Sequence, residues 1–161
     1  MIPKLGYAFQ SIWVSGFSRK LTVKNLLFPI KMMVSFIQSF ILNMKFKQNV
    51  AIGAGAYVSG PVAWVASILG SKLVVLEQNS FPGITNRILE KRADSVHISF
   101  EDSRSYFKNK SKIKLTGNPI RLTLKLTEKD DAKASFSLNK NKKVLLVIGG
   151  SLGASSINEA I

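Results

Sequence analysis

A glycine-rich stretch at residues 53–61 constrains the fold of this chain more than any other feature of its sequence. It reads Gly-Ala-Gly-Ala-Tyr-Val-Ser-Gly-Pro and follows the apolar run Val-Ala-Ile at residues 50–52. Glycine permits positive φ and a close approach to the backbone, and proline suits the first position of a helix, so we expect the next helix to begin at Pro61. A strand, a glycine turn and a helix start bring free N–H groups and the helix dipole to one point. The stretch therefore predicts either an anion site, in particular for phosphate, or a turn that needs glycine for steric reasons alone.

Strand-like and helix-like segments alternate along the rest of the chain. Apolar runs predict strands at residues 9–14, 49–52, 72–76, 95–100, 112–115 and 144–148. Helical patterns cover residues 21–47, where Pro29 begins the main helix, residues 61–69, closed by Gly70, and residues 83–91. This alternation predicts an α/β fold built on a parallel sheet with helices on both faces.

The chain changes character after Arg121. Residues 122–142 are polar, charged and without clear periodicity, which is typical of a linker or an irregular segment. A continuous apolar run then leads into a second glycine turn at residues 149–154. We therefore expect a first domain at 1–121, a linker at 122–142 and the start of a second domain at 143–161.

Composition narrows the classes of function. The 161 residues contain no cysteine and one histidine, His97, which excludes disulfides, thiolate metal sites and multi-histidine metal sites. A formal charge of +14 favours a polyanionic partner, namely nucleic acid, an anionic membrane or a phosphorylated substrate. Nucleic acid is the least favoured of the three, because the lysines are scattered over loops without the interleaved aromatic residues of an RNA-binding sheet. The sequence shows no signal peptide at its start and no run of about 18 apolar residues, so we expect a cytoplasmic protein that touches a membrane.

Four motifs follow one another along the chain: the glycine-rich stretch itself, Glu77-Gln78-Asn79 with residues 82–87, residues 117–121, and residues 149–154. In this order and spacing they resemble the MurG family of bacterial glycosyltransferases, over nearly the whole chain. The resemblance implies a doubly wound, Rossmann-like parallel sheet that forms part of a two-domain GT-B enzyme. It also implies transfer of N-acetylglucosamine from UDP-N-acetylglucosamine to lipid I, which gives lipid II for peptidoglycan synthesis. Such enzymes need no cofactor or metal and lie peripherally on the cytoplasmic side of the plasma membrane.

Within that resemblance, Asn79, Arg121 and Ser151 correspond to family positions that contact UDP-N-acetylglucosamine. Asn79 follows a predicted strand, where ligands of open α/β sheets bind. Arg121 offers a planar fork to an oxygen-rich partner, and an interdomain salt bridge is an equal alternative. Ser151 adds a hydroxyl inside a glycine turn, where it can also cap the following helix.

The resemblance places further residues in the acceptor and diphosphate part of the cleft: Gly53, Gly55, Tyr57, Ser59, Gly60, Asn86, Gly150, Gly153 and Asn158. For Tyr57 the alternative is a packed ring with a satisfied hydroxyl. Glu77 either orients a substrate hydroxyl and assists proton transfer, or accepts backbone N–H groups of its own loop, which is the interpretation we favour.

The general base of the implied reaction is not identified. Family members carry a histidine before the Glu-Gln-Asn triplet, where this sequence has Leu76. His97 does not replace it, because His97 lies within a strand pattern. The family's first strand with its Gly-Gly-Thr-Gly-Gly-His loop, which supplies the favoured base, and most of the nucleotide-sugar domain are not in this sequence. We therefore expect the 161 residues alone to be an unstable and inactive fragment.

Apolar residues recur at helical spacing in the segment from Leu21 to Lys47. They are Ile30, Met33, Val34, Ile37, Phe40, Ile41 and Met44. The default interpretation of such a stripe is burial in the protein's own core. Other apolar residues lie off the stripe, however, and basic residues surround it: Arg19, Lys20, Lys24, Lys31, Lys45 and Lys47. That pattern also fits a helix on an anionic membrane surface, as the resemblance implies.

Two other functions stay open. A nucleotide-dependent oxidoreductase also uses a strand, glycine turn and helix like those at residues 144–154, but the acidic residue it needs about 20 residues further on lies past Ile161. A non-catalytic Rossmann-like module that binds anions or nucleotides also accounts for the charge and the glycine turns.

Overall fold

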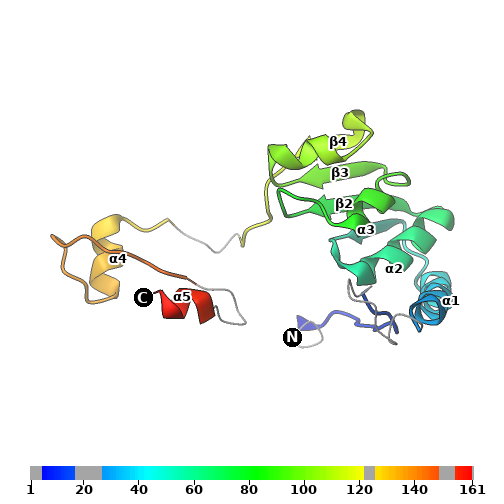
Figure 1. Ribbon diagram of the computed structural model, residues 1–161, viewed down its shortest axis with the longest axis horizontal. Coiled ribbons are helices and arrows are strands. Elements are labelled where there is room, and N and C mark those ends of the chain that lie inside the picture. Colours follow the sequence, from blue (N-terminus) through cyan, green and yellow to red (C-terminus); the bar gives the residue numbers. More distant parts are fainter. Residues whose placement is uncertain (1–4, 17–26, 122–125, 149–154, 161) are drawn as a thin grey trace. The chain divides into compact units, whose positions relative to one another are not determined.

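The computed structural model describes residues 5–16, 27–121, 126–148 and 155–160 (Figure 1). The chain forms two compact units, Met1–Pro119 and Ile120–Ile161. The first unit contains α1 (Phe28–Phe46), β1 (Val50–Gly53), α2 (Ala56–Ile68), β2 (Lys72–Glu77), α3 (Ile84–Leu89), β3 (Ser95–Ile98), the 3-10 helices η3 (Glu101–Tyr106) and η4 (Lys110–Lys112), and β4 (Ile113–Leu115). The second unit contains α4 (Lys129–Ser135) and α5 (Ser155–Glu159).

The four strands are parallel and form one sheet in the order β1-β2-β3-β4. Connections between parallel neighbouring strands are almost always right-handed, so the order β1-β2-β3 places the connecting helices α2 and α3 on the same face. Figure 1 shows the two helices side by side. The strand residues that face these helices are fully buried: Leu73, Val75, Val96 and Ile98. They pack with Ala63 of α2 and form the hydrophobic core. The predicted parallel α/β sheet is confirmed.

The opposite face of the sheet carries apolar side chains, and those of β1 are exposed to solvent. Val50 and Ile52 alternate with the residues that face α2, and Ile52 is 63% exposed. Val74 and Leu76 of β2 are half-buried on the same side. α2 and α3 both cover the first face of the sheet. The predicted helices on the opposite face therefore stay a prediction.

Two of the predicted strands do not form. Residues 9–14 are irregular, and the Trp13 N–H donates to Gln38 Oε1 of α1 at 2.7 Å instead of to a strand. Residues 144–148 are also irregular and largely exposed. A strand needs a neighbouring backbone to complete its hydrogen-bond ladder, and within the described ranges no segment offers one to either run.

The predicted start of α2 at Pro61 is wrong, because the helix begins at Ala56. Gly55 has φ at 82° and Ala56 has φ at 60°, so two successive residues with positive φ lead the chain into the helix. Pro61 therefore lies inside α2, where its missing N–H removes one intrahelical hydrogen bond. Gly60 has no Cβ to clash with the proline ring, which allows a helical conformation in front of it.

The expectation of an irregular segment at residues 122–142 is also wrong in part, because α4 forms within it. Acidic residues occupy the first turn of α4 and Lys133 lies in its last turn, so both ends complement the helix dipole. Lys133 Nζ donates to the carbonyl oxygens of Lys140 and Lys142, the latter at 2.8 Å. These bonds hold the following chain against the helix.

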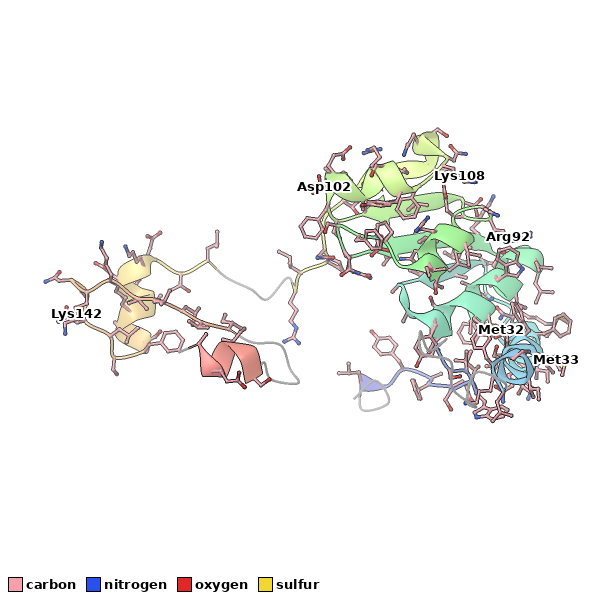
Figure 2. The ribbon with its side chains drawn as sticks, viewed as in Figure 1. Met32, Met33, Arg92, Asp102, Lys108 and Lys142 are labelled. Atoms are coloured by element: carbon pink, nitrogen blue, oxygen red, sulfur yellow. The ribbon has the colours of Figure 1, made fainter. Side chains whose placement is uncertain are left out.

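α1 has the predicted Pro29 in its first turn, but it turns its apolar stripe outward. Its buried residues are Ser35, Ser39 and Asn43, which recur once per turn. Their polar groups are satisfied locally, since Ser39 Oγ donates to Ser35 O at 2.6 Å and Asn43 Nδ2 to Ser39 O at 2.7 Å. Small side chains let α1 approach α2 closely. The default burial of the stripe is therefore wrong: Met33 is 60% exposed, and Figure 2 shows it on the outer side of α1.

Asp94 joins the start of β2 to the turn before β3, and it makes stability depend on pH. Its carboxylate accepts the Leu73 N–H at 2.8 Å and Lys72 Nζ at 3.0 Å. The Leu73 hydrogen bond, followed by the Lys72 hydrogen bond, lowers the pKa of Asp94 below its ordinary value. Because the folded state has the lower pKa, this stabilisation is present above about pH 4 and is lost as the pH falls through the folded value.

We expect Asp94→Ala to lower the free energy of unfolding by about 1 kcal/mol at pH 7 and by less at pH 3. Urea unfolding of the wild type and the variant at both pH values measures the difference. An equal loss at the two pH values would contradict the stabilising role of the ionised carboxylate.

Candidate functional site

The carboxyl ends of the parallel strands lie along one edge of the sheet, and hydrogen bonds connect the loops there. Gln78 Nε2 donates to Ala54 O at 3.2 Å, which joins the loops after β1 and β2. Ser99 Oγ donates to Asn118 Oδ1 at 2.7 Å, which joins the loops after β3 and β4. Ligands of open α/β sheets bind at such an edge, so this edge is the candidate functional site.

The glycines of the 53–61 stretch have different roles. Gly55 has φ 82° and ψ −166°, a conformation available essentially to glycine alone. At Gly53 a Cβ would lie 3.3 Å from Leu89 Cδ1, and at Gly60 a Cβ would lie 3.3 Å from Thr85 Cγ2. Gly53 and Gly60 therefore serve the close packing of α2 and β1 against α3. Glycine is thus needed at Gly53 and Gly60 for steric reasons, and at Gly55 for its backbone conformation.

The N-terminus of α2 lies at the candidate site without a side-chain cap. Gly55 is the N-cap and provides no side-chain cap, and no side chain of the described residues is seen to accept a hydrogen bond from the first-turn N–H groups. Ser59 does not cap them, because its Oγ donates to Gly55 O at 2.6 Å and to Ala56 O at 2.9 Å. Uncapped N–H groups and the positive end of a 13-residue helix favour an anion.

Glu77 ends β2 and is 2% exposed. Its Oε1 accepts the backbone N–H and the Nδ2 of Asn79, both at 3.0 Å. Its Oε2 accepts the Gly83 N–H at 3.2 Å and Asn86 Nδ2 at 2.8 Å. The interpretation that Glu77 accepts N–H groups of its own loop is confirmed. A buried carboxylate with four such bonds organises the loop between β2 and α3.

Asn86 lies behind this loop and is 1% exposed. Besides Glu77, its Nδ2 also donates to Leu76 O at 2.9 Å. Its Oδ1 is buried and has no hydrogen-bond partner in the described part of the chain. A Cβ at Gly55 would lie 3.6 Å from Asn86 Nδ2 and 3.5 Å from Gln78 Oε1. Asn86 therefore bonds to Glu77 and lies close to the Gly55 turn.

Tyr57 is half exposed near the start of α2, beside Gly16. It lines an apolar groove of about 470 Å³ together with residues of α1, α2 and α3. Prominent lining residues are Met32, Phe36, Trp64, Ile84 and Ile88. The ring of Tyr57 packs against Gly16, and its contact with a ligand stays a prediction.

The remaining predicted site residues belong to the second unit or lie outside the described residues, so their place at this edge stays a prediction. Gly150, Ser151 and Gly153 lie outside the described residues. Asn158 belongs to α5, but its side chain is likewise outside the described part. Arg121 is exposed at the start of the second unit.

Three residues at the sheet edge were missed as site residues: Gln78, Ser99 and Asn118. Gln78 lies inside the Glu-Gln-Asn triplet, and Ser99 is the first polar residue after β3, so both positions carried a signal. His97 lies in β3 as expected, with Nε2 3.3 Å from Ser95 Oγ. In the described residues no three His, Cys, Asp or Glu side chains are grouped as metal ligands would be.

Comparison with known proteins agrees with this geometry. Residues 1–98 match the glycosyltransferase family 28 N-terminal domain. A relative from Flavobacterium psychrophilum, named UDP-N-acetylglucosamine--N-acetylmuramyl-(pentapeptide) pyrophosphoryl-undecaprenol N-acetylglucosamine transferase, is 43% identical over 99% of this chain and 44% of its own length. A relative of the same name from Ruminiclostridium cellulolyticum is 41% identical over 100% of this chain and 44% of its own length.

A crystal structure of Acinetobacter baumannii MurG is similar with a TM-score of 0.50 and 29% identity, over 65% of this chain and 29% of that chain. The resemblance to MurG expected from the four motifs is thus confirmed. The chain spans about 44% of the length of the relatives named above. Because residues 1–98 of the 161 match its N-terminal domain, the chain belongs to glycosyltransferase family 28.

Proposed function

We propose that this chain supplies the acceptor-side domain of an enzyme that transfers N-acetylglucosamine from UDP-N-acetylglucosamine to lipid I, which yields lipid II. The names of relatives that match 98–100% of the chain carry the proposal. An acceptor hydroxyl oxygen bonds to the anomeric carbon of the sugar, the bond from that carbon to the phosphate oxygen breaks, and UDP leaves. The hydroxyl proton passes to a general base.

The uncapped start of α2 is suited to hold the diphosphate of the acceptor. The first-turn N–H groups after Gly55 and the helix dipole provide positive charge without a metal. Asn79, at the same sheet edge, is suited to contact the sugar of UDP-N-acetylglucosamine. Arg121 and Ser151 complete the nucleotide-sugar contacts in this proposal. Accordingly, residues 1–121 form the acceptor domain, 122–142 a linker and 143–161 the start of the nucleotide-sugar domain.

The test measures sugar transfer from UDP-N-acetylglucosamine to a lipid I analogue. A full-length enzyme that contains these 161 residues should form the disaccharide product, and the 161 residues alone should not. Binding of phosphate or nucleotide by the full-length enzyme without any transfer would favour the alternative, a non-catalytic Rossmann-like module.

The exposed stripe on α1 supports contact with an anionic membrane. Ile37, Phe40 and Met44 are each about half exposed on one side of the helix. Lys31, near its start, and Lys45, near its end, lie on the same helix. An apolar stripe with basic neighbours is typical of a helix that rests on a membrane surface. Arg19, Lys20 and Lys24 lie outside the described residues, and no described helix is long and apolar enough to span a membrane. We place the protein peripherally on the cytoplasmic face of the plasma membrane.

Charge reversal at Lys31, Lys45 and Lys47 tests this contact. We expect the triple glutamate variant of the full-length enzyme to bind anionic phosphatidylglycerol vesicles about 100-fold more weakly, since each basic residue near the surface contributes about 1 kcal/mol. Co-sedimentation with vesicles measures the affinity. The control reverses Lys91, Lys108 and Lys114, which are exposed lysines of the same unit away from α1. Equal weakening by both triple variants would refute a membrane surface centred on α1.

A further inference from the structure

Glu77 has a role at the sugar site beyond holding its loop together. We propose that Glu77 is a positioning residue that fixes which end of the Asn79 amide faces the ligand. The Asn79 side chain then presents its carbonyl oxygen to the ligand. This oxygen accepts a hydrogen bond from a hydroxyl or N–H group of the sugar. The inference rests on the proposed function for the identity of the ligand, but the orientation of Asn79 follows from contacts within the chain.

The chemistry of the carboxylate determines this orientation. An asparagine amide has similar shapes at its two ends, and only its hydrogen-bond partners decide which end points where. A carboxylate accepts hydrogen bonds and donates none. Because Asn79 lies 3.0 Å from Glu77 Oε1, it must direct its NH2 group toward the carboxylate. Its Oδ1 is left without a protein partner in the described structure, on a residue that is exposed.

The Glu77 carboxylate is itself fixed by hydrogen bonds, so it does not rotate together with the Asn79 amide. Its second oxygen accepts the Gly83 N–H and Asn86 Nδ2, so both ends of the carboxylate are engaged. The backbone N–H of Asn79 is bound to the same oxygen as its side chain. The amide is therefore oriented before any ligand arrives, which lowers the ordering cost of binding.

Asn86 shows how strongly the carboxylate controls its neighbours. Turning the Asn86 amide over would give its buried NH2 group a new direction, but it would place Oδ1 against Glu77 Oε2 and Leu76 O, which are both acceptors. The structure keeps the NH2 group on these two oxygens and leaves Oδ1 buried without a partner. The Glu77 carboxylate thus orients the Asn79 amide, and together with the Leu76 carbonyl oxygen it orients the Asn86 amide.

A double-mutant cycle in the full-length enzyme tests the inference. Glu77→Gln replaces one acceptor oxygen by an NH2 group, so Asn79 loses its fixed orientation. We expect KM for UDP-N-acetylglucosamine to rise about 10-fold, the equivalent of one lost hydrogen bond, while kcat changes less. In an Asn79→Ala background, Glu77→Gln should change KM by no more than about twofold, because coupled residues are not additive. The same rise in both backgrounds would overturn the positioning role, and so would an unchanged KM.

Glu90→Gln is the matched control. Glu90 is also a buried glutamate of this unit, and its Oε1 accepts the Asn109 N–H at 2.6 Å. It lies at the end of α3 and not in the loop after β2. We expect Glu90→Gln to lower the stability in urea unfolding and to leave KM unchanged. This comparison separates a general loss of stability from loss of the Asn79 orientation.

A measurement on the wild type tests the orientation without relying on catalysis. In NMR spectra of the asparagine-labelled full-length enzyme, the Asn79 side-chain NH2 protons should exchange with water about 10-fold more slowly than those of Asn118. Asn118 uses its Oδ1 to accept from Ser99 and has no described partner for its NH2 group. Equal exchange would overturn the inference even if Glu77→Gln fails to fold. If the wild type binds no UDP-N-acetylglucosamine, the proposed function is refuted. Slow exchange of the Asn79 NH2 protons in that case would still establish the orientation of the amide.

Discussion

Replacing Gly55 by alanine is expected to lower kcat/KM for the lipid I analogue by about 100-fold in the full-length enzyme, because displacements of about 1 Å at a binding site cost that much. With φ 82° and ψ −166°, Gly55 occupies a backbone conformation that a Cβ strains by about 1–3 kcal/mol. The turn must relax to relieve that strain. The first-turn N–H groups of α2 then move away from the position that suits a diphosphate, so KM for the acceptor should rise more than KM for UDP-N-acetylglucosamine.

Gly70→Ala is the matched control for Gly55→Ala. Gly70 also has positive φ, at +92°, and a Cβ there would meet no atom within 4 Å. It lies at the opposite end of α2 from the candidate site. We expect a loss of about 1 kcal/mol in the free energy of unfolding and no change in acceptor KM. An acceptor KM that rises equally in both variants would contradict an anion site at the start of α2.

Phe107→Ala is expected to have the largest effect on stability, a loss of about 3–5 kcal/mol in the free energy of unfolding. Phe107 follows η3, is 1% exposed and belongs to the core that β2, β3 and β4 share. Alanine would leave a cavity beneath the sheet. Since a domain is stable by only about 5–15 kcal/mol, the variant should unfold at much lower urea concentration than the wild type.

The control for Phe107→Ala is Phe100→Ala, which removes the same side chain from the N-cap of η3. Phe100 is 48% exposed, so its loss should cost about 1 kcal/mol or less. Urea unfolding of both variants measures the difference. Similar losses at the two positions would show that Phe107 is not part of a cooperative core.

Local sequence patterns predicted the elements that depend on local interactions or on a central place in the sheet. The helix at α1 with Pro29 in its first turn and the buried strands β2 and β3 lie close to where the periodicity placed them. Residues 9–14 and 144–148 have equally apolar sequences, yet they form no strand. Strand formation depends on a partner backbone, which an apolar run does not reveal.

The sequence indicated which residues follow β1 and β2, but only part of how these residues contact one another. Motifs at the ends of predicted strands placed Gly55, Glu77 and Asn79 at one sheet edge, because the ends of parallel strands coincide. The sequence did not reveal that Gln78 connects the β1 and β2 loops. It also did not reveal that Asn86 is buried behind Glu77 with an unpaired oxygen. Both depend on distances between loops that are remote in sequence.

The order and spacing of residues along the chain are enough to predict the parallel α/β class, the glycine turn before α2 and the family. Contacts between elements that are separate in the sequence determine which face of α1 points inward and which groups the buried carboxylate of Glu77 binds. Ser35 and Ser39 lie on the buried side of α1, which packs with α2. A close approach of two helices needs small side chains, and the apolar stripe is therefore left outside. Helical periodicity locates a stripe on a helix, but neighbouring elements determine whether the core or the surface receives it.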